Sequence, residues 1–246
     1  MTKYTFKYRL TPTKEQEVLL AKHFGCCRFV YNYFLAKRID AYNTDKTSLK
    51  LKDNSKELPI LKTELSWLKE VGSQSLQYSV ECLQNAYDNF FRRLKVKKKG
   101  QNPGFPVFKK RHSKQSFKVK QGIRIANDKL IIPKFLEGIP IVLHRELERT
   151  INFATISKNK SGNYFVAITV TRDVKVLPGS SEIIGIDLNV KHIVDSNGNK
   201  YDNPRPEHNN RDRLRMLSKA VSRCEKGSNG RKKAKQKLAK FKQYSH

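Results

Sequence analysis

The spacing of the hydrophobic residues changes from helical to strand-like near Lys95, and that change limits the folds open to this chain. Before Lys95, we expect a loop at Thr44–Ser55 and a helix at Leu58–Val71. Residues Ser73–Leu94 then carry an apolar stripe at helical spacing, formed by Leu76, Val80, Leu83, Tyr87, Phe90 and Leu94. After Lys95 come short apolar runs separated by turn residues, which is the pattern of β-strands. The chain therefore predicts an α+β fold that is mainly helical up to Lys95 and β-rich directly after it.

The strand-like runs are short and closely spaced, and one more lies at the N-terminus. Apolar and polar residues alternate over Met1–Leu10, which predicts a half-buried strand. The later runs are Phe117–Gln121, Ile123–Ala126, Leu130–Pro133, Ile139–His144, Ile151–Ser157 and Tyr164–Thr171. Asn127-Asp128 and Lys160–Asn163 carry turn-forming residues. Several short strands at this spacing predict a small β-barrel.

A pair of helices is expected directly after the first strand. Thr13 and Gln16 form a capping-box pattern, so a helix begins at Lys14, and Gly25 is a natural stop for it. A second helix, Cys26–Tyr42, follows at once. Two short helices joined near a glycine resemble a helix-turn-helix. The residues that could lie on its outer face are Arg28, Asn32, Lys37 and Arg38.

Positive charge dominates the composition, with 51 Lys and Arg against 22 Asp and Glu and a net charge of +29. Such a surplus repels itself unless a polyanion neutralises it, and nucleic acids are the usual polyanions. A membrane surface is the competing anionic partner. No membrane partner is expected, because the sequence has neither a bilayer-spanning apolar run nor a lipid-anchor signal. The N-terminus lacks the apolar block of a signal peptide, so we expect a cytoplasmic location.

The densest positive charge lies between Arg92 and Lys120, which hold twelve Lys or Arg and no acid over 29 positions. Basic side chains neutralise phosphates, so this segment predicts nucleic-acid binding. The candidate residues are Arg92, Arg93, Lys97, Lys98, Lys99, Lys109, Lys110, Arg111 and Lys114, together with Arg28 and Asn32 from the helix pair. Phe105, Phe108 and Phe117 either stack on bases or fill the barrel core, and the core is the commoner place for Phe.

A second basic segment, Arg205–His246, holds fourteen Lys or Arg and three acids. Its apolar spacing predicts two helices around a turn at Gly227–Gly230. These helices are either a further binding surface or a solvated pair.

Candidate metal ligands are few. Asp187 lies within the apolar run Ile183–Leu188, where burying a charge is costly without compensation. Mg²⁺ is one possible partner, and the alternative is an edge-strand carboxylate that faces water. His192–Asp195 and Lys200–Tyr201 predict two further strands, paired with the first as hairpins. No zinc site is expected, because no two of Cys26, Cys27, Cys82 and Cys224 have zinc-knuckle spacing, so they read as reduced thiols.

Three groups of residues, in order along the chain, form recognisable motifs. They are Tyr8–Gln16 with Gly25–Asn32, Phe105–Arg111 with Gln115–Phe117, and Gly185–Leu188 with Val190–His192. Together they resemble the TnpB-type (OrfB) family of insertion-sequence proteins. The resemblance implies an RNA-guided DNA nuclease whose partners are a guide RNA and DNA. It also implies that Asp187 is the first catalytic carboxylate and a Mg²⁺ ligand of a RuvC domain.

The layout of the family implies three parts. Residues 1–10 and 101–173 would form a wedge-like β-barrel, and residues 13–99 an inserted helical recognition lobe with helix-turn-helix character. Residues 182–246 would be the first strands of an incomplete RNase H-like (RuvC) domain with basic helices.

Family members continue with a Glu on a later strand, a four-cysteine zinc ribbon and a final Asp, none of which this chain offers. We therefore expect a truncated chain that binds nucleic acid without cutting it, since one carboxylate cannot hold two metal ions. The alternatives are a helix-turn-helix repressor, or an active nuclease whose missing carboxylates come from a partner chain. The oligomeric state is left open.

Overall fold

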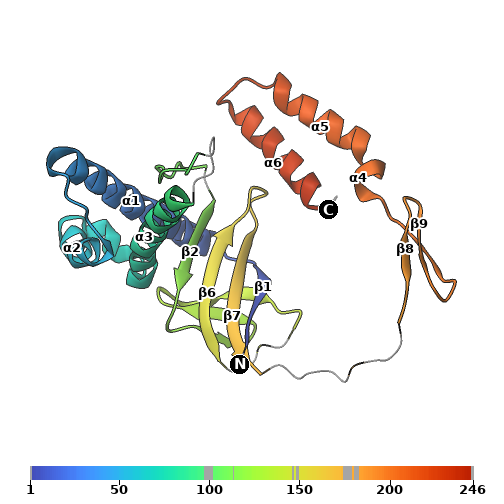
Figure 1. Cartoon of the computed structure of the whole chain (residues 1–246), viewed down its shortest axis with the longest axis horizontal. Helices are drawn as coiled ribbons and strands as arrows, with labels where there is room; N and C mark the ends of the chain where they lie inside the picture. The colour runs from blue at the N-terminus through green and yellow to red at the C-terminus, as the bar shows by residue number, and fades with distance from the viewer. Residues whose placement is uncertain are drawn as a thin grey trace. The chain divides into compact units, whose positions relative to one another are not determined.

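The computed structural model describes residues 2–96, 102–112, 114–145, 147, 150–173, 179 and 183–244. The chain divides into two compact units: unit 1 is Met1–Asn159 with Asn163–Arg172, and unit 2 is Lys160–Gly162 with Asp173–His246. Unit 1 combines helices with a seven-stranded antiparallel sheet, and unit 2 combines helices with a three-stranded one (Figure 1). The predicted α+β class is therefore confirmed. In the described part of the chain, no helix is long and apolar enough to cross a membrane.

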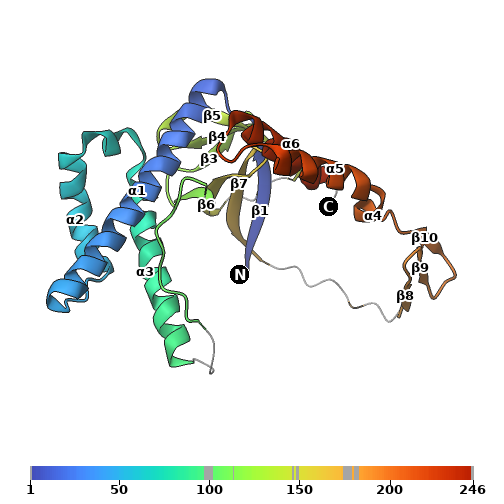
Figure 2. The ribbon, with the colours of Figure 1, turned by 90° about the horizontal axis from the view of Figure 1, so that it is seen from above.

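The helical part of unit 1 begins with one long helix, α1 (Lys14–Asp45). Thr13 caps it as predicted, because its hydroxyl oxygen accepts from the Gln16 backbone N–H at 3.3 Å and the Gln16 side chain accepts from the Thr13 N–H at 3.1 Å. The predicted stop at Gly25 is wrong, since α1 continues through it without a break (Figure 2). A glycine inside a helix costs about 1 kcal/mol relative to alanine. Burial of the apolar face of α1 on both sides of Gly25 offsets that cost.

Three further helical segments complete this part. α2 (Leu51–Glu64) begins inside the segment predicted as a loop, so that only residues 46–50 connect it to α1. The helix predicted at Leu58–Val71 is the end of α2 followed by the 3-10 helix η1 (Ser66–Glu70). α3 (Ser73–Lys95) spans the predicted residues and packs on α1.

The strands of unit 1 form one antiparallel sheet in the order β2-β6-β7-β1-β5-β4-β3. They are β1 Thr2–Leu10, β2 Gln115–Val119, β3 Arg124–Ala126, β4 Lys129–Ile132, β5 Phe135–Val142, β6 Ile151–Lys158 and β7 Tyr164–Arg172. Each of these strands overlaps a predicted one. Asn127 and Asp128, with φ of 49° and 53°, form the predicted turn between β3 and β4.

Strand β1 ties the N-terminal residues into a sheet made from much later ones. It pairs with β7 along its whole length and with β5 through Arg9 and Leu10 at its end. Residues 2–10 therefore share a sheet with residues 115–172, although the helical residues 14–95 separate them in sequence. Among the described strands no pairing joins β2 to β3. Closure into a barrel stays a prediction, as do the boundaries of the three predicted domains.

The helices α1 and α3 pack against β2, and helices and sheet share one hydrophobic core (Figure 1). His23 of α1 lies in this core and stacks on Phe117 of β2, with ring centroids 4.9 Å apart. Its Nδ1 lies 2.9 Å from the Leu19 carbonyl oxygen, and its Nε2 accepts from the Gly72 N–H at 3.1 Å. Both ring nitrogens are thus engaged inside the protein.

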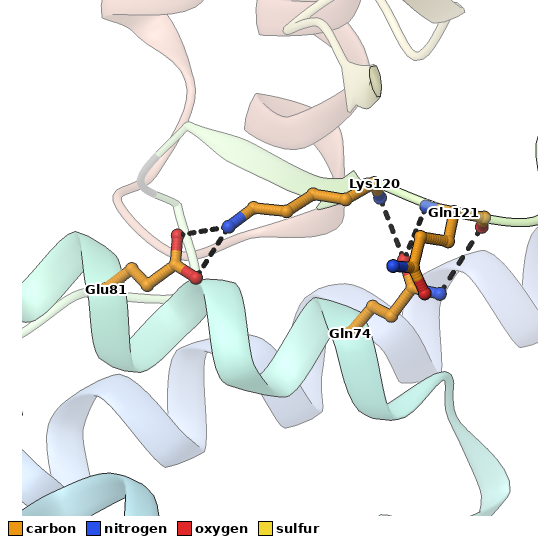
Figure 3. A network of polar contacts seen from close by, with 4 residues as sticks. All are labelled: Gln74, Glu81, Lys120 and Gln121. Carbon is orange, nitrogen blue, oxygen red and sulfur yellow. Dashed lines mark hydrogen bonds and ion pairs between the residues drawn. The ribbon is translucent and has the colours of Figure 1, made fainter. Parts of the chain in front are cut away.

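A polar network joins α3 to the end of β2 (Figure 3). Gln74 Oε1 accepts from the backbone N–H groups of Lys120 and Gln121, at 2.8 and 2.9 Å, and Gln74 Nε2 donates to the Gln121 carbonyl at 3.3 Å. Further along α3, Glu81 pairs with the Lys120 ammonium at 2.7 Å. The position of α3 beside β2 therefore rests on hydrogen bonds as well as on apolar packing.

Unit 2 holds the second sheet and the basic helices. β8 (Ile186–Leu188), β9 (His192–Asp195) and β10 (Lys200–Asp202) pair antiparallel in the order β10-β9-β8, as predicted. The helices α4 (Pro206–Asn209), α5 (Arg211–Arg223) and α6 (Asn229–Tyr244) follow. α5 packs on α6, which confirms the predicted helix pair. The apolar residues around β8 are exposed, with Ile183 at 94% and Leu188 at 76%.

Candidate nucleic-acid interface

Residues 102–112, here called the basic segment, connect α3 to β2 and are fastened to both long helices. Asn32 of α1 donates from Nδ2 to the Lys109 carbonyl at 3.0 Å and accepts from the Lys109 N–H at 2.8 Å. The Phe105 ring meets Tyr87 and Phe90 of α3 edge-on, with centroids 5.7 and 5.2 Å apart. These contacts fix the backbone from which Lys109, Lys110 and Arg111 project.

The Lys109 ammonium is partly buried against α1. Its Nζ lies 3.9 Å from the centroid of the Tyr31 ring, a cation–π contact. Burial lowers the pKa of Lys109 below its usual value of 10.5, and the nearby thiols of Cys82 and Cys27 act in the opposite direction. Within the described residues no carboxylate pairs with this ammonium. A cation held in this way is stabilised by an anion that approaches it.

A small hollow with a volume of about 60 Å³ opens beside Lys109. Its lining comes from α1, from α3 and from the residues that lead into β2: Phe24, Cys27, Arg28, Tyr78, Ser79, Cys82, Lys109, Lys110, Lys114, Gln115 and Ser116. The fold thus brings together four of the predicted binding residues. Tyr78, Ser79 and Cys82 escape sequence reasoning, because only the packing of α3 on α1 and β2 places them here.

The other predicted binding residues of this region are not in the lining of the hollow. Arg92 and Arg93 are exposed near the end of α3. Arg92 donates to the side-chain oxygen of Asn89 at 2.9 Å, and Arg93 donates to the Asn89 backbone carbonyl at 3.0 Å. Arg111 is exposed at the end of the basic segment. Lys97, Lys98 and Lys99 lie outside the described residues.

Two residues expected on the outer face of a helix-turn-helix have partners on neighbouring helices. The expectation for Arg38 is wrong, because its side chain is buried and lies over the Tyr87 ring, 5.0 Å from the centroid. Its guanidinium donates to Gln84 at 2.8 Å and faces the Asn54 amide oxygen. Lys37 is exposed but pairs with Glu57 of α2 at 2.6 Å. Since α1 does not turn at Gly25, this face of it contacts α2 and α3.

The three phenylalanines of the basic region have different environments. Phe117 is buried in the core, as the favoured interpretation predicted. For Phe105 and Phe108 that interpretation is wrong, because 47% and 50% of these residues are exposed. Exposed aromatic faces beside cations are typical of surfaces on which bases stack.

Asp187 lies on β8, the edge strand of its sheet, and is exposed. Its Oδ2 accepts from Asn189 Nδ2 at 2.9 Å, and Val194 is its cross-strand neighbour. Asp195, the nearest acid on β9, bonds Asn199 at 2.8 Å and so holds the adjacent turn. In the part of the chain that the structure describes, no group of three His, Cys, Asp or Glu could hold a metal ion. A single exposed carboxylate does not fit a two-metal centre.

The cysteines are free thiols, as predicted. Burial raises the pKa of Cys26 to about 11 and that of Cys27 to about 12, so both are protonated at neutral pH. Protonated thiols are poor nucleophiles and poor metal ligands.

Known proteins resemble this chain along most of its length. A family model described as a helix-turn-helix domain, of the OrfB type of IS605 elements, matches residues 1–47. A Streptomyces pristinaespiralis protein named "Putative RNA-guided DNA endonuclease" is 32% identical over 243 residues, which cover 97% of this chain and 59% of that protein. The Escherichia coli protein InsQ, given the same description, is 29% identical over 242 residues, covering 96% of this chain and 58% of InsQ. The chain thus spans less than two thirds of these relatives.

A solved complex of Cas12f1 with guide RNA and target DNA aligns with 99% of this chain and 67% of the Cas12f1 chain, at a TM-score of 0.39 and 11% identity. That likeness is too low to assign a fold.

The family model and the two relatives define the class of this protein: an insertion-sequence protein that carries an OrfB-type helix-turn-helix domain. The family model over residues 1–47 and the two relatives along most of the chain agree with the resemblance to the TnpB-type (OrfB) family that the three groups of motifs predict. In this chain the region matched by the helix-turn-helix model is β1 followed by the unbroken α1.

Proposed function

We propose that this chain binds a guide RNA and DNA, as the relatives' names imply for those proteins, through the cationic surface of unit 1. The observation that carries the proposal is the exposed set Arg92, Arg93, Lys110, Arg111 and Lys114. These residues belong to a stretch of 29 positions without an acid. The exposed rings of Phe105 and Phe108 lie in the same stretch and offer faces for unpaired bases.

Titration of RNA affinity against salt tests this proposal. Phosphate contacts release counterions, so the logarithm of the affinity should fall linearly with the logarithm of the salt concentration. Affinity that stays level between low and high salt would contradict it.

A charge-reversal pair makes the test specific for the surface. The first variant replaces Arg92, Arg93, Lys110, Arg111 and Lys114 by Glu. The control replaces five exposed lysines elsewhere in unit 1, Lys14, Lys50, Lys52, Lys56 and Lys69, by Glu. Both variants lower the net charge of +29 by ten, to +19. We expect a much larger loss of RNA affinity in the first variant, and equal losses would mean that total charge alone governs binding.

The proposal also holds that this chain by itself binds without cutting. Phosphate cleavage by two metal ions needs several carboxylates around one site. Asp187 stands without such neighbours among the described residues. Incubation with Mg²⁺, RNA and supercoiled DNA should therefore leave the DNA intact. Nicking that disappears in Asp187→Ala would overturn this part and would favour an active nuclease.

Footprinting without RNA separates the proposal from a helix-turn-helix repressor. A repressor protects a discrete DNA site by itself and places a recognition helix after a turn. Because α1 runs through Gly25 without that turn, we expect no discrete footprint unless RNA is present.

A further inference from the structure

We propose that the hollow between α1, α3 and the start of β2 is a pocket for one backbone phosphate of the bound nucleic acid. The inference rests on the proposed function and adds to it a defined site, the group it takes and the residues that hold that group. The pocket is lined by Arg28, Lys109, Lys110 and Lys114 and has a volume of about 60 Å³. By the same measure a cavity needs about 10–15 Å³ to hold one water molecule, so the hollow has room for a small polyatomic group.

The charge of the lining points to an anion. Four of its residues are cationic and none is an acid. Elsewhere in unit 1, lysines have carboxylate partners: Lys22 pairs with Glu70, Lys37 with Glu57 and Lys120 with Glu81. Arg28, Lys109 and Lys114 have no such partner among the described residues. The pocket therefore gathers three cations, Arg28, Lys109 and Lys114, that have no carboxylate partner in the described part of the chain.

The position of Lys109 indicates a built site rather than a chance patch of lysines. The two hydrogen bonds with Asn32 fix the Lys109 backbone, and the Lys109 Nζ lies 3.9 Å from the centroid of the Tyr31 ring. The side chain is ordered and partly desolvated before any ligand arrives, which reduces the entropy lost on binding. Burial lowers the pKa of this ammonium, and a phosphate in the hollow would act in the opposite direction.

The hydrogen-bonding groups of the lining suit a phosphate. Arg28 offers a guanidinium fork, and Lys109 and Lys114 offer ammonium donors, all of which pair well with phosphate oxygens. Ser116 and Gln115 line the same hollow and add neutral donors. A carboxylate ligand could use the same cations, but nucleic acid is the polyanion that the rest of the basic region favours.

The test measures RNA affinity and its salt dependence with a single-stranded RNA oligonucleotide that has no terminal phosphate. Three variants remove one cation each or two together: Lys109→Met, Arg28→Met and the double variant. Lys37→Met is the matched control, since Lys37 lies on α1, the helix of Arg28, and pairs with Glu57 outside the pocket. Methionine keeps most of the length and the apolar stem of the lysine side chain.

We expect Lys109→Met and Arg28→Met each to weaken RNA binding about tenfold or more, and Lys37→Met to leave it nearly unchanged. One contacted phosphate contributes about 0.7 to the salt slope of a single strand. Because both cations neutralise the same phosphate, the double variant should lower the slope by about 0.7 and not by twice that amount. Lys109→Arg should restore most of the affinity.

Several outcomes would overturn the pocket. One is a loss of RNA affinity in Lys109→Met no larger than that in Lys37→Met. Another is a double variant whose salt slope falls by about twice 0.7, as for two contacted phosphates. If Lys109→Met unfolds, Arg28→Met carries the same test from a part-exposed position.

Thermal unfolding with added inorganic phosphate is a second experiment. Stabilisation by inorganic phosphate, with RNA affinity unchanged in the variants, would show a free-anion site and so overturn the assignment to backbone phosphate. Absence of salt-dependent RNA binding in the unaltered chain would instead contradict the proposed function.

Discussion

Asn32 and Lys109 are joined by two hydrogen bonds between a side-chain amide and a backbone peptide group, at 3.0 and 2.8 Å. The amide satisfies both the donor and the acceptor of Lys109, as a strand neighbour would. One residue of α1 thereby fixes a segment that has no regular secondary structure of its own. The sequence suggested Asn32 as a residue that contacts nucleic acid. The structure gives its amide a role in positioning the residues beside the hollow.

Asn32→Ala should destabilise the protein by about 1–3 kcal/mol, because it leaves two part-buried backbone groups without their partners. Urea denaturation at neutral pH measures the change. Asn32→Asp keeps the acceptor for the Lys109 N–H but sets a carboxylate oxygen against the Lys109 carbonyl, so it should also destabilise the protein. If the alanine variant were as stable as the unaltered chain, the basic segment would have to be held by other contacts.

Stability should fall with acid because of His23. Its Nε2 accepts from the Gly72 N–H, so the folded state needs the neutral ring, and burial lowers its pKa below the usual 6.5. Below pH 6.5 the unfolded chain therefore binds a proton that folded His23 does not. The free energy of unfolding then falls as the pH drops from about 6.5 toward the lower pKa of the folded state.

The midpoint of thermal unfolding, followed from pH 8 to pH 5, measures this effect. His23→Gln can still accept from Gly72, and it should be less stable than the unaltered chain at pH 8. It should also lose less stability between pH 7 and pH 5. Parallel pH profiles for the two proteins would show that other groups cause the acid sensitivity.

The sequence predicts elements better than it predicts how they meet. The strands β1 to β7 and the helix α3 follow from local periodicity, because each has an apolar face that repeats within a few residues. Gly25 misleads, since a glycine after a short amphipathic run is a common stop, and only the tertiary packing of α1 overrides it. Arg38 looks exposed for a related reason: its partners Asn54 and Gln84 come from two other helices.

The candidate site shows the same limit. Lys109, Lys110 and Lys114 are identifiable from charge alone, because they lie in a run without acids. Their convergence with Arg28 depends on α1 and α3 crossing beside β2, which no local pattern contains. Asp187 lies in a run of sequence that resembles a family motif, but its exposure on an edge strand appears only in the structure.

Gln74 and Glu81 should contribute unequally to stability although both tie α3 to Lys120 (Figure 3). Gln74→Ala removes three hydrogen bonds to backbone groups and should cost about 1–2 kcal/mol. Glu81→Ala removes an ion pair between exposed or half-exposed side chains, which is worth about 0–1 kcal/mol. Chemical denaturation at low and high salt separates the two, because only the effect of Glu81→Ala should shrink with salt. A larger loss for Glu81→Ala would mean that the ion pair is the main tie.

Gly25→Ala should stabilise the protein by about 0.5–1 kcal/mol, since alanine loses less conformational entropy in a helix and gains helix propensity. The site tolerates the added methyl group, because a Cβ at Gly25 would meet no atom within 4 Å. Gly138→Ala is the contrasting variant: Gly138 has φ of 78°, and its Cβ would come within 2.7 Å of the Lys129 Cβ. That variant should lose stability. Thermal and urea unfolding compare the two, and a destabilised Gly25→Ala protein would show that α1 needs a break at Gly25, as the helix-turn-helix pattern of the sequence suggests.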